Sequence, residues 1–170
     1  MLSRRALLAA TALAVPSLAL VGCAGMSSQQ VINTAAQDTA TIAAGLKGAL
    51  ANIGTLNIKG LTSDKVQTAE MAVADLQVAA AALAQASTAG AAQPIVQQVE
   101  GDVNALVGAL AGIQWPPEQK SIATALAAAQ VLVPVIESAV GMVTAATQKP
   151  ATSAAMSPDA ARAILLGAAR

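Results

Sequence analysis

Few side chains in this 170-residue chain could carry out chemistry. There is no histidine, phenylalanine or tyrosine, and there is one cysteine, Cys23, and one tryptophan, Trp115. Histidine is the commonest general base and metal ligand, and a single cysteine can form neither an internal disulfide nor a thiolate cluster. A lone aromatic ring also leaves little for the stacking of bases or sugars. The sequence therefore argues against an enzyme, a metal or other cofactor, and a nucleic-acid partner.

The remaining reactive groups form no catalytic pattern. Thr62 and Lys65 have a spacing that a hydroxyl–lysine nucleophile pair can have, but Thr62 and Ser63 are ordinary caps where a helix is expected to begin. Glu100 and Asp102 are two residues apart, so on a helix they point to different faces, and we expect both to be solvated. Basic and acidic residues balance at 9 each, which is not the basic excess of a nucleic-acid-binding domain.

The first 22 residues have the three-part organisation of an export signal. A short positive stretch contains Arg4 and Arg5, and an apolar run over residues 6–20 follows it. This run is too short to span a bilayer comfortably, which takes about 20 apolar residues. We therefore expect a cleaved signal peptide over residues 1–22.

The end of this segment, Leu20-Val21-Gly22-Cys23, resembles the lipobox of bacterial lipoprotein precursors. The resemblance covers residues 1–23, and it is specific because the only cysteine stands where the apolar run ends. It implies that the Cys23 sulfur receives a diacylglyceryl group, and that cleavage between Gly22 and Cys23 makes Cys23 the acylated N-terminus. Ala24 follows in place of aspartate, which in Gram-negative members implies an outer-membrane anchor with the protein facing the periplasm.

A second export motif overlaps the positive stretch. Ser3-Arg4-Arg5-Ala6-Leu7-Leu8 resembles the twin-arginine signal, in which a serine and two arginines precede apolar residues. The alternative is an ordinary general secretory signal that carries two arginines. Both export routes stay open.

The rest of the chain is rich in alanine, the best helix former, and lacks the clusters of β-branched and aromatic residues that mark strands. We expect an all-α protein: residues 23–30 are the lipidated cysteine and a tether, 31–147 a helical bundle, and 148–170 a linker with a C-terminal helix. The bundle helices are predicted at about 30–57, 63–88, 94–114 and 117–147, and the last helix starts near Pro158. Four such helices with short turns predict an antiparallel up-down four-helix bundle, with the last helix as a lid or a free arm.

Apolar stripes at spacings of three and four residues give the predicted core. Its members are Ile32, Ala35, Thr39, Ile42, Leu46, Ala49, Ile53 and Leu56; Val66, Ala69, Val73, Leu76, Ala80, Leu83 and Ser87; Val96, Val99, Val103, Leu106, Leu110 and Ile113; and Ile122, Leu126, Ala129, Val133, Ile136, Val140 and Val143.

Three local features carry alternatives. Residues 121–146 hold a single charge, Glu137, and we favour a core helix over a membrane-spanning one, with a kink at Pro134. Gly108-x-x-x-Gly112 predicts close helix packing inside the bundle rather than membrane dimerisation. Trp115, before two prolines, is expected to close one end of the bundle, the alternatives being a headgroup anchor or a partner contact.

Together these features predict a non-catalytic, membrane-anchored lipoprotein that serves as a structural or protein-interaction component of the bacterial cell envelope. Its partner would be another protein or another copy of the chain. An alternative is a periplasmic module that binds a lipid or another hydrophobic ligand in a cavity between the helices. A further alternative is membrane activity of the helices themselves, such as pore formation.

Overall fold

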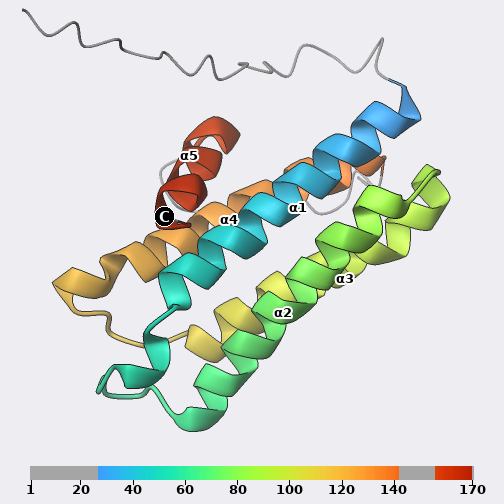
Figure 1. The fold of residues 1–170 in the computed structure, drawn as a ribbon. Helices are drawn as coiled ribbons and strands as arrows, with labels where there is room; N and C mark the ends of the chain where they lie inside the picture. Colours follow the sequence, from blue (N-terminus) through green and yellow to red (C-terminus); the bar gives the residue numbers. More distant parts are fainter. Residues whose placement is uncertain (1–26, 142–155, 170) are drawn as a thin grey trace, which may run out of the picture.

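In the computed structural model, which describes residues 27–141 and 156–169, all regular structure is helical (Figure 1). These ranges contain five α-helices and two short 3-10 turns. They are α1 (Ser28–Leu50), η1 (Ile53–Thr55), α2 (Ser63–Gln85), α3 (Ala89–Leu110), η2 (Pro117–Gln119), α4 (Lys120–Val140) and α5 (Pro158–Ala168). The all-helical prediction is confirmed for this part of the chain. The signal segment, Cys23, the first half of the predicted tether and nearly all of the linker lie outside the described residues. The tether was predicted to reach residue 30, but α1 already begins at Ser28.

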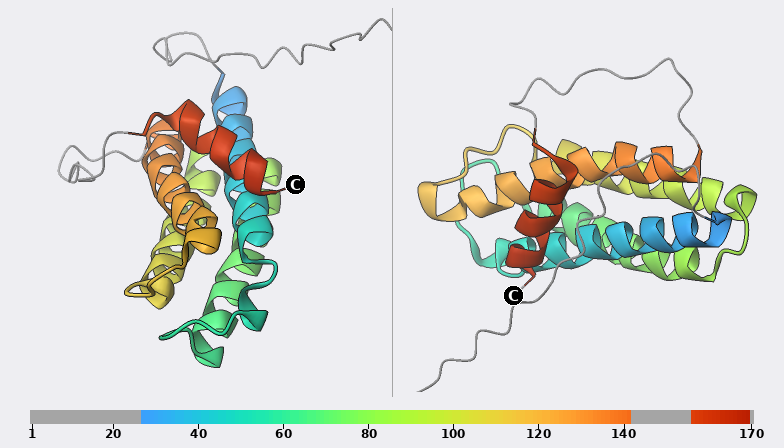
Figure 2. Two further views of the ribbon diagram at one scale, coloured as in Figure 1. Left: turned by 90° about the vertical axis from the view of Figure 1, so that its left-hand side faces the viewer. Right: turned by 90° about the horizontal axis from the view of Figure 1, so that it is seen from above.

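The long helices pack against one another in chain order. α1 contacts α2, α2 contacts α3, α3 contacts α4, and α4 in turn contacts α1. Figures 1 and 2 show α1 to α4 side by side, with the short helix α5 lying across α1 and α4. The last helix is therefore docked on the bundle, and of the two alternatives predicted for it, a lid or a free arm, the free arm was wrong.

The core follows the predicted stripes closely. Every predicted position in α3 and α4 that the structure describes is buried, and so are those of α1 apart from the half-buried Ala49. Leu56, which follows η1, and Val66 of α2 are also only half-buried. Thr39 fits this apolar setting because its hydroxyl donates a hydrogen bond to the carbonyl oxygen of Ala35, 2.8 Å away. Val143 lies outside the described residues, and Ser87 is exposed in a turn rather than buried. Many core positions are alanines, so the helix backbones can approach closely.

Two predicted helix boundaries in the first half were wrong. α1 ends at Leu50 rather than near residue 57, because the chain tightens there: the amide of Ala51 bonds the carbonyl of Gly48 three residues back, and η1 follows. α2 ends at Gln85, before the predicted stop near residues 88–90. Its start agrees with the prediction, and Thr62 is the cap, accepting a hydrogen bond from the Lys65 amide at 3.4 Å. The hydroxyl of Thr62 thus caps the N-terminus of α2.

α3 begins five residues before the predicted Pro94. Thr88 caps it by accepting a hydrogen bond from the Ala91 amide at 3.2 Å, so Pro94 lies inside the helix. Proline has no amide to donate to the carbonyl of Gly90, but both residues are exposed, where water can satisfy that oxygen. A cap with a good side-chain acceptor thus starts this helix ahead of its proline.

α4 begins after the turn η2 and ends at Val140, not near residue 147 as predicted. Gly141 stops it by adopting a left-handed conformation (φ +83°), in which its amide bonds the carbonyls of Glu137 and Ser138. A glycine in this conformation is a common helix end, because it carries no Cβ to clash. The apolar residues that follow Gly141 in the sequence hid this signal.

By length and composition, the segment Pro117–Val140 could cross a membrane: it has 24 residues, and its most apolar window has a mean hydropathy of 1.7. In the structure 44% of that window is buried, and α4 packs against α1, α3 and α5. The helix continues through Pro134, which is exposed. This packing supports the interpretation of α4 as a core helix.

Candidate functional site

The residues predicted for lipidation and export, namely Cys23, Gly22, Arg4 and Arg5, lie outside the described part of the chain. The structure begins four residues after Cys23, at the cap of α1. Ser27 accepts a hydrogen bond from the Gln30 amide at 3.3 Å, and the Gln30 side chain accepts one from the Ser27 amide at 2.8 Å. This reciprocal capping box fixes where the first helix starts. The chain that leads back to Cys23 therefore leaves the bundle at a defined point.

That point lies beside the turn between α2 and α3. The side-chain amide of Gln29 donates a hydrogen bond to the carbonyl oxygen of Ala86 at 3.3 Å, which ties the start of α1 to the end of α2. Figure 1 shows the start of α1 and the α2–α3 turn at the same end of the molecule. We call this end, formed by residues 27–31 and 85–94, the anchor end.

The most specific polar contact lies elsewhere, between α5 and α1. The Arg162 guanidinium makes a two-pronged ion pair with Asp38: Nε to Oδ1 and Nη2 to Oδ2 are each 2.7 Å. A third nitrogen, Nη1, is 2.9 Å from Oδ1 of Asp159. Asp38 is only 6% exposed. The hydrogen bond to Asp38 is the main cause of a raised Arg162 pKa, so the guanidinium stays charged.

Sequence reasoning missed this pair, because Asp38 and Arg162 are 124 residues apart and no local pattern joins them. Buried carboxylates are rare unless they are paired, so the contact accounts for a charge inside an apolar stripe. We regard it as a structural clasp that holds α5, since one carboxylate and one guanidinium supply no acid–base or nucleophilic pair.

Two glycines on α1 let α5 approach. A Cβ added at Gly45 would lie 2.6 Å from Cβ of Leu165, and one added at Gly48 would meet the backbone carbonyl oxygen of Ala168. Leu165 is fully buried at this contact. The prediction of a close approach at Gly108 and Gly112 was wrong: a Cβ at either would meet nothing within 4 Å among the residues that the structure describes, and Gly112 is a turn residue with φ +75°.

Sequence reasoning expected Glu100 and Asp102 to be solvated, and the structure corrects this in part. Glu100 is exposed, but it neighbours Glu137 of α4. Burial of Glu137, followed by the nearby Glu100 carboxylate, raises the pKa of Glu137. Asp102 is partly buried, and burial followed by the charge of Asp75 on α2 raises its pKa. Its Oδ2 is buried, and no hydrogen-bond donor in the described residues reaches it. One carboxyl pair, Glu100 and Glu137, therefore lies where α3 packs on α4. The other pair, Asp102 and Asp75, lies where α3 packs on α2.

These pairs predict a pH dependence of stability. The folded state binds the protons of Asp102 and Glu137 more tightly than the unfolded chain, so their contribution is favourable at mildly acid pH and is lost as pH rises through the raised pKa values. We expect a higher urea midpoint at mildly acid pH, close to the ordinary pKa of a carboxyl group, than at neutral pH. Glu137→Gln should flatten this difference, with Glu70→Gln on the exposed face of α2 as the matched control. A midpoint that rises from mildly acid to neutral pH would contradict this account.

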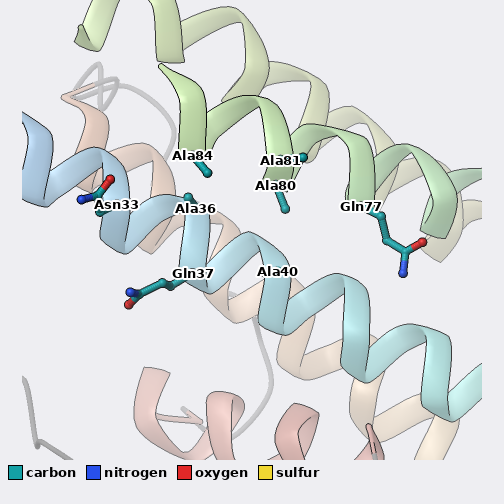
Figure 3. A pocket seen from close by; sticks show the side chains of 8 residues that line it. All are labelled: Asn33, Ala36, Gln37, Ala40, Gln77, Ala80, Ala81 and Ala84. Carbon is teal, nitrogen blue, oxygen red and sulfur yellow. The ribbon is translucent and has the colours of Figure 1, made fainter. Parts of the chain in front are cut away.

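A shallow groove of about 490 Å³ runs between α1 and α2 (Figure 3). Alanines of both helices line it, and amide side chains flank it; the lining residues are Asn33, Ala36, Gln37, Ala40, Gln77, Ala80, Ala81 and Ala84. It is open to solvent and holds no charged group, so it does not enclose a small ligand. Among the described residues, no group of three or more histidine, cysteine, aspartate or glutamate side chains could hold a metal ion.

Trp115, the one aromatic residue, lies between α3 and η2 and is partly buried against the core. Partial burial is common to all three roles expected for the ring, namely closing the end of the bundle, anchoring at headgroups and contacting a partner. Comparison with protein-family models, curated proteins and solved structures found no match to this chain. The function has to be inferred from the residues themselves.

Proposed function

We propose that this chain is a lipid-anchored, non-catalytic protein of the bacterial envelope, which acts through contact with a protein partner or with other copies of itself. The observation that carries the proposal is Cys23, the one cysteine, which follows Leu20-Val21-Gly22 at the end of an apolar export segment. Lipid on Cys23 would place the bundle on the periplasmic face of the outer membrane. Ala24 supports that destination.

The fold supports a role in positioning or contact. We infer an antiparallel up-down arrangement of α1 to α4, because each long helix packs on its neighbours in chain order and α4 packs on α1. The hydrogen bond from Gln29 to Ala86 supports the same arrangement, since it joins the start of α1 to the end of α2. The groove between α1 and α2 is open and shallow, which favours contact with another macromolecule over enclosure of a hydrophobic ligand.

Cys23→Ser is expected to release the protein from membranes, because stable anchoring takes at least two acyl chains and the variant could receive none. The measurement is membrane fractionation with a mild carbonate wash, followed by detection of the chain. Ala24→Ser, which keeps Cys23 and a small neighbour, is the matched control and should remain in the membrane pellet. If Cys23→Ser also stayed in the pellet after the wash, the anchor proposal would be wrong.

A further inference from the structure

Charged side chains are absent from the anchor end over a considerable length. Residues 27–37, which include the first three turns of α1, contain no aspartate, glutamate, lysine or arginine. The same is true of residues 76–99, which form the second half of α2, the turn and the first half of α3. The exposed side chains there are alanine, glutamine, serine and threonine, together with Asn33, Val78 and Pro94.

The first charges stand at similar depths on three helices. Asp38 is the eleventh residue of α1, Asp75 is the eleventh from the end of α2, and Glu100 is the twelfth of α3. At 1.5 Å of rise per residue, each lies about 15 Å from the anchor end. Glu137 of α4 is beside Glu100 and so stands at the same depth. These carboxylates thus form a belt around the bundle, about 15 Å from the uncharged anchor end.

Lysines in the described residues stand at the opposite end. Lys47 is in the last turn of α1, Lys59 is in the connection to α2, Lys65 is in the first turn of α2, and Lys120 is the first residue of α4. Since α1 has 23 residues, this end is about 35 Å from the anchor end. The lysines of the described residues therefore stand far from the place where the lipid would be, and the Arg162 guanidinium is paired with Asp38 and Asp159.

The connection to the lipid is short. Residues 24–26 are all that separate Cys23 from the cap residue Ser27, and three or four residues reach at most about 14 Å when extended. A bundle held this closely meets its membrane with whichever surface surrounds the start of α1. That surface is the uncharged anchor end.

We propose that the anchor end contacts the phospholipid headgroups of the membrane that holds the Cys23 lipid. The long helices then lie roughly along the membrane normal, and the lysine end points away from the membrane. This inference rests on the lipid anchor proposed above. Moving a charged side chain towards the hydrocarbon of a membrane costs free energy, and the anchor end avoids that cost because its side chains are uncharged. The carboxylate belt lies beyond a Debye length of about 8–10 Å, so repulsion from anionic lipids is largely screened.

The upright orientation also says where a partner would bind. The membrane covers the anchor end, so the surfaces left for a protein partner are the long sides of the bundle and the lysine end. Contact at the lysine end would then occur about 35 Å from the membrane surface, and contact on the long sides would occur nearer to it.

The orientation can be measured with Trp115, because the connection between α3 and α4 lies at the lysine end (Figure 1). The lipidated protein is reconstituted into phosphatidylcholine vesicles that contain a dansyl-labelled phosphatidylethanolamine. Energy transfer from tryptophan to dansyl is then compared between the natural chain and Trp115→Leu/Ser87→Trp, which moves the donor to the exposed α2–α3 turn. We expect transfer several-fold greater from position 87.

A second variant, Ser87→Trp with Trp115 retained, keeps the packing of the natural ring and should show greater transfer than the natural chain. Equal transfer from both positions would mean that the bundle lies on its side, and greater transfer from Trp115 would mean that it is inverted. No transfer from either position in protein that floats with the vesicles would mean that the bundle is held away from the membrane or that a partner covers its end. Each of these results overturns the orientation alone, whereas protein that fails to float overturns the anchor as well.

Discussion

Arg162→Ala is expected to lower the free energy of unfolding by about 2–4 kcal/mol, because it leaves the Asp38 carboxylate buried without a counter-charge. Breaking a fully buried ion pair costs about 3–5 kcal/mol. The Arg162 side chain is 27% exposed, so some water reaches the vacated site and the expected loss is smaller. The measurement is urea unfolding of the variant and the natural chain at neutral pH, followed by circular dichroism.

Asp159→Ala is the matched control for this contact. It removes the third contact of the same guanidinium, but Asp159 is 72% exposed and lies one helical turn away, so the pair contributes under about 1 kcal/mol. Asp38→Leu/Arg162→Met should recover much of the loss, because an apolar pair of similar size removes the unpaired charge. A cost for Arg162→Ala no larger than that for Asp159→Ala would show that the clasp contributes nothing beyond a surface ion pair.

Gly48→Ala is expected to destabilise the docking of α5 although alanine favours the helix that carries it. The new Cβ would meet the carbonyl oxygen of Ala168, a backbone atom that moves only if α5 shifts. Overpacking of this kind costs about 1–3 kcal/mol, against a gain of about 1 kcal/mol from replacing a helical glycine. The clearest measurement is hydrogen exchange of the α5 amides, which should speed up in the variant while α2 and α3 stay protected.

The chain supplies its own control for this substitution. Gly108 lies inside α3 and a Cβ there would meet nothing within 4 Å, so Gly108→Ala should raise the free energy of unfolding by about 0.5–1 kcal/mol. The two variants make the same chemical change with opposite expected signs. If both stabilised the protein, the close contact between α1 and α5 would not exist in solution.

The sequence specified most of the architecture because the architecture depends on local patterns. Alanine content predicted helices, and spacings of three and four residues predicted which side chains are buried, down to single positions such as Thr39 and Leu106. Helix ends were harder. The cap at Thr88 and the stop at Gly141 depend on which of several polar or small residues adopts the required backbone conformation, and neighbouring signals such as Pro94 compete with them.

Long-range contacts were outside the reach of the sequence. The pairing of Asp38 with Arg162 joins segments whose separation along the chain says nothing about their distance in space. Glycine spacing likewise shows only where a backbone could approach, and not whether a neighbour is there. Hence Gly45 and Gly48 lie against α5, while a Cβ added at Gly108 or Gly112, which have the better-known spacing, would meet no neighbour within 4 Å in the described part of the chain.

The candidate site shows the same division. Cys23 is proposed from the sequence alone, because its motif is local and specific. The separation of an uncharged end from a lysine end could be seen only in the folded structure. The uncharged stretches of residues 27–37 and 76–99 form one end because α1 and the α2–α3 turn come together. Placement of the helical bundle on a membrane is the function that we propose from these two observations.

The most direct test of that proposal is the mass of the N-terminal peptide of the protein isolated from membranes of cells that export it. We expect a mature chain that begins at Cys23 and carries a diacylglyceryl group on its sulfur, with residues 1–22 removed. A chain that keeps residues 1–22, or one that begins elsewhere with an unmodified Cys23, would contradict the account.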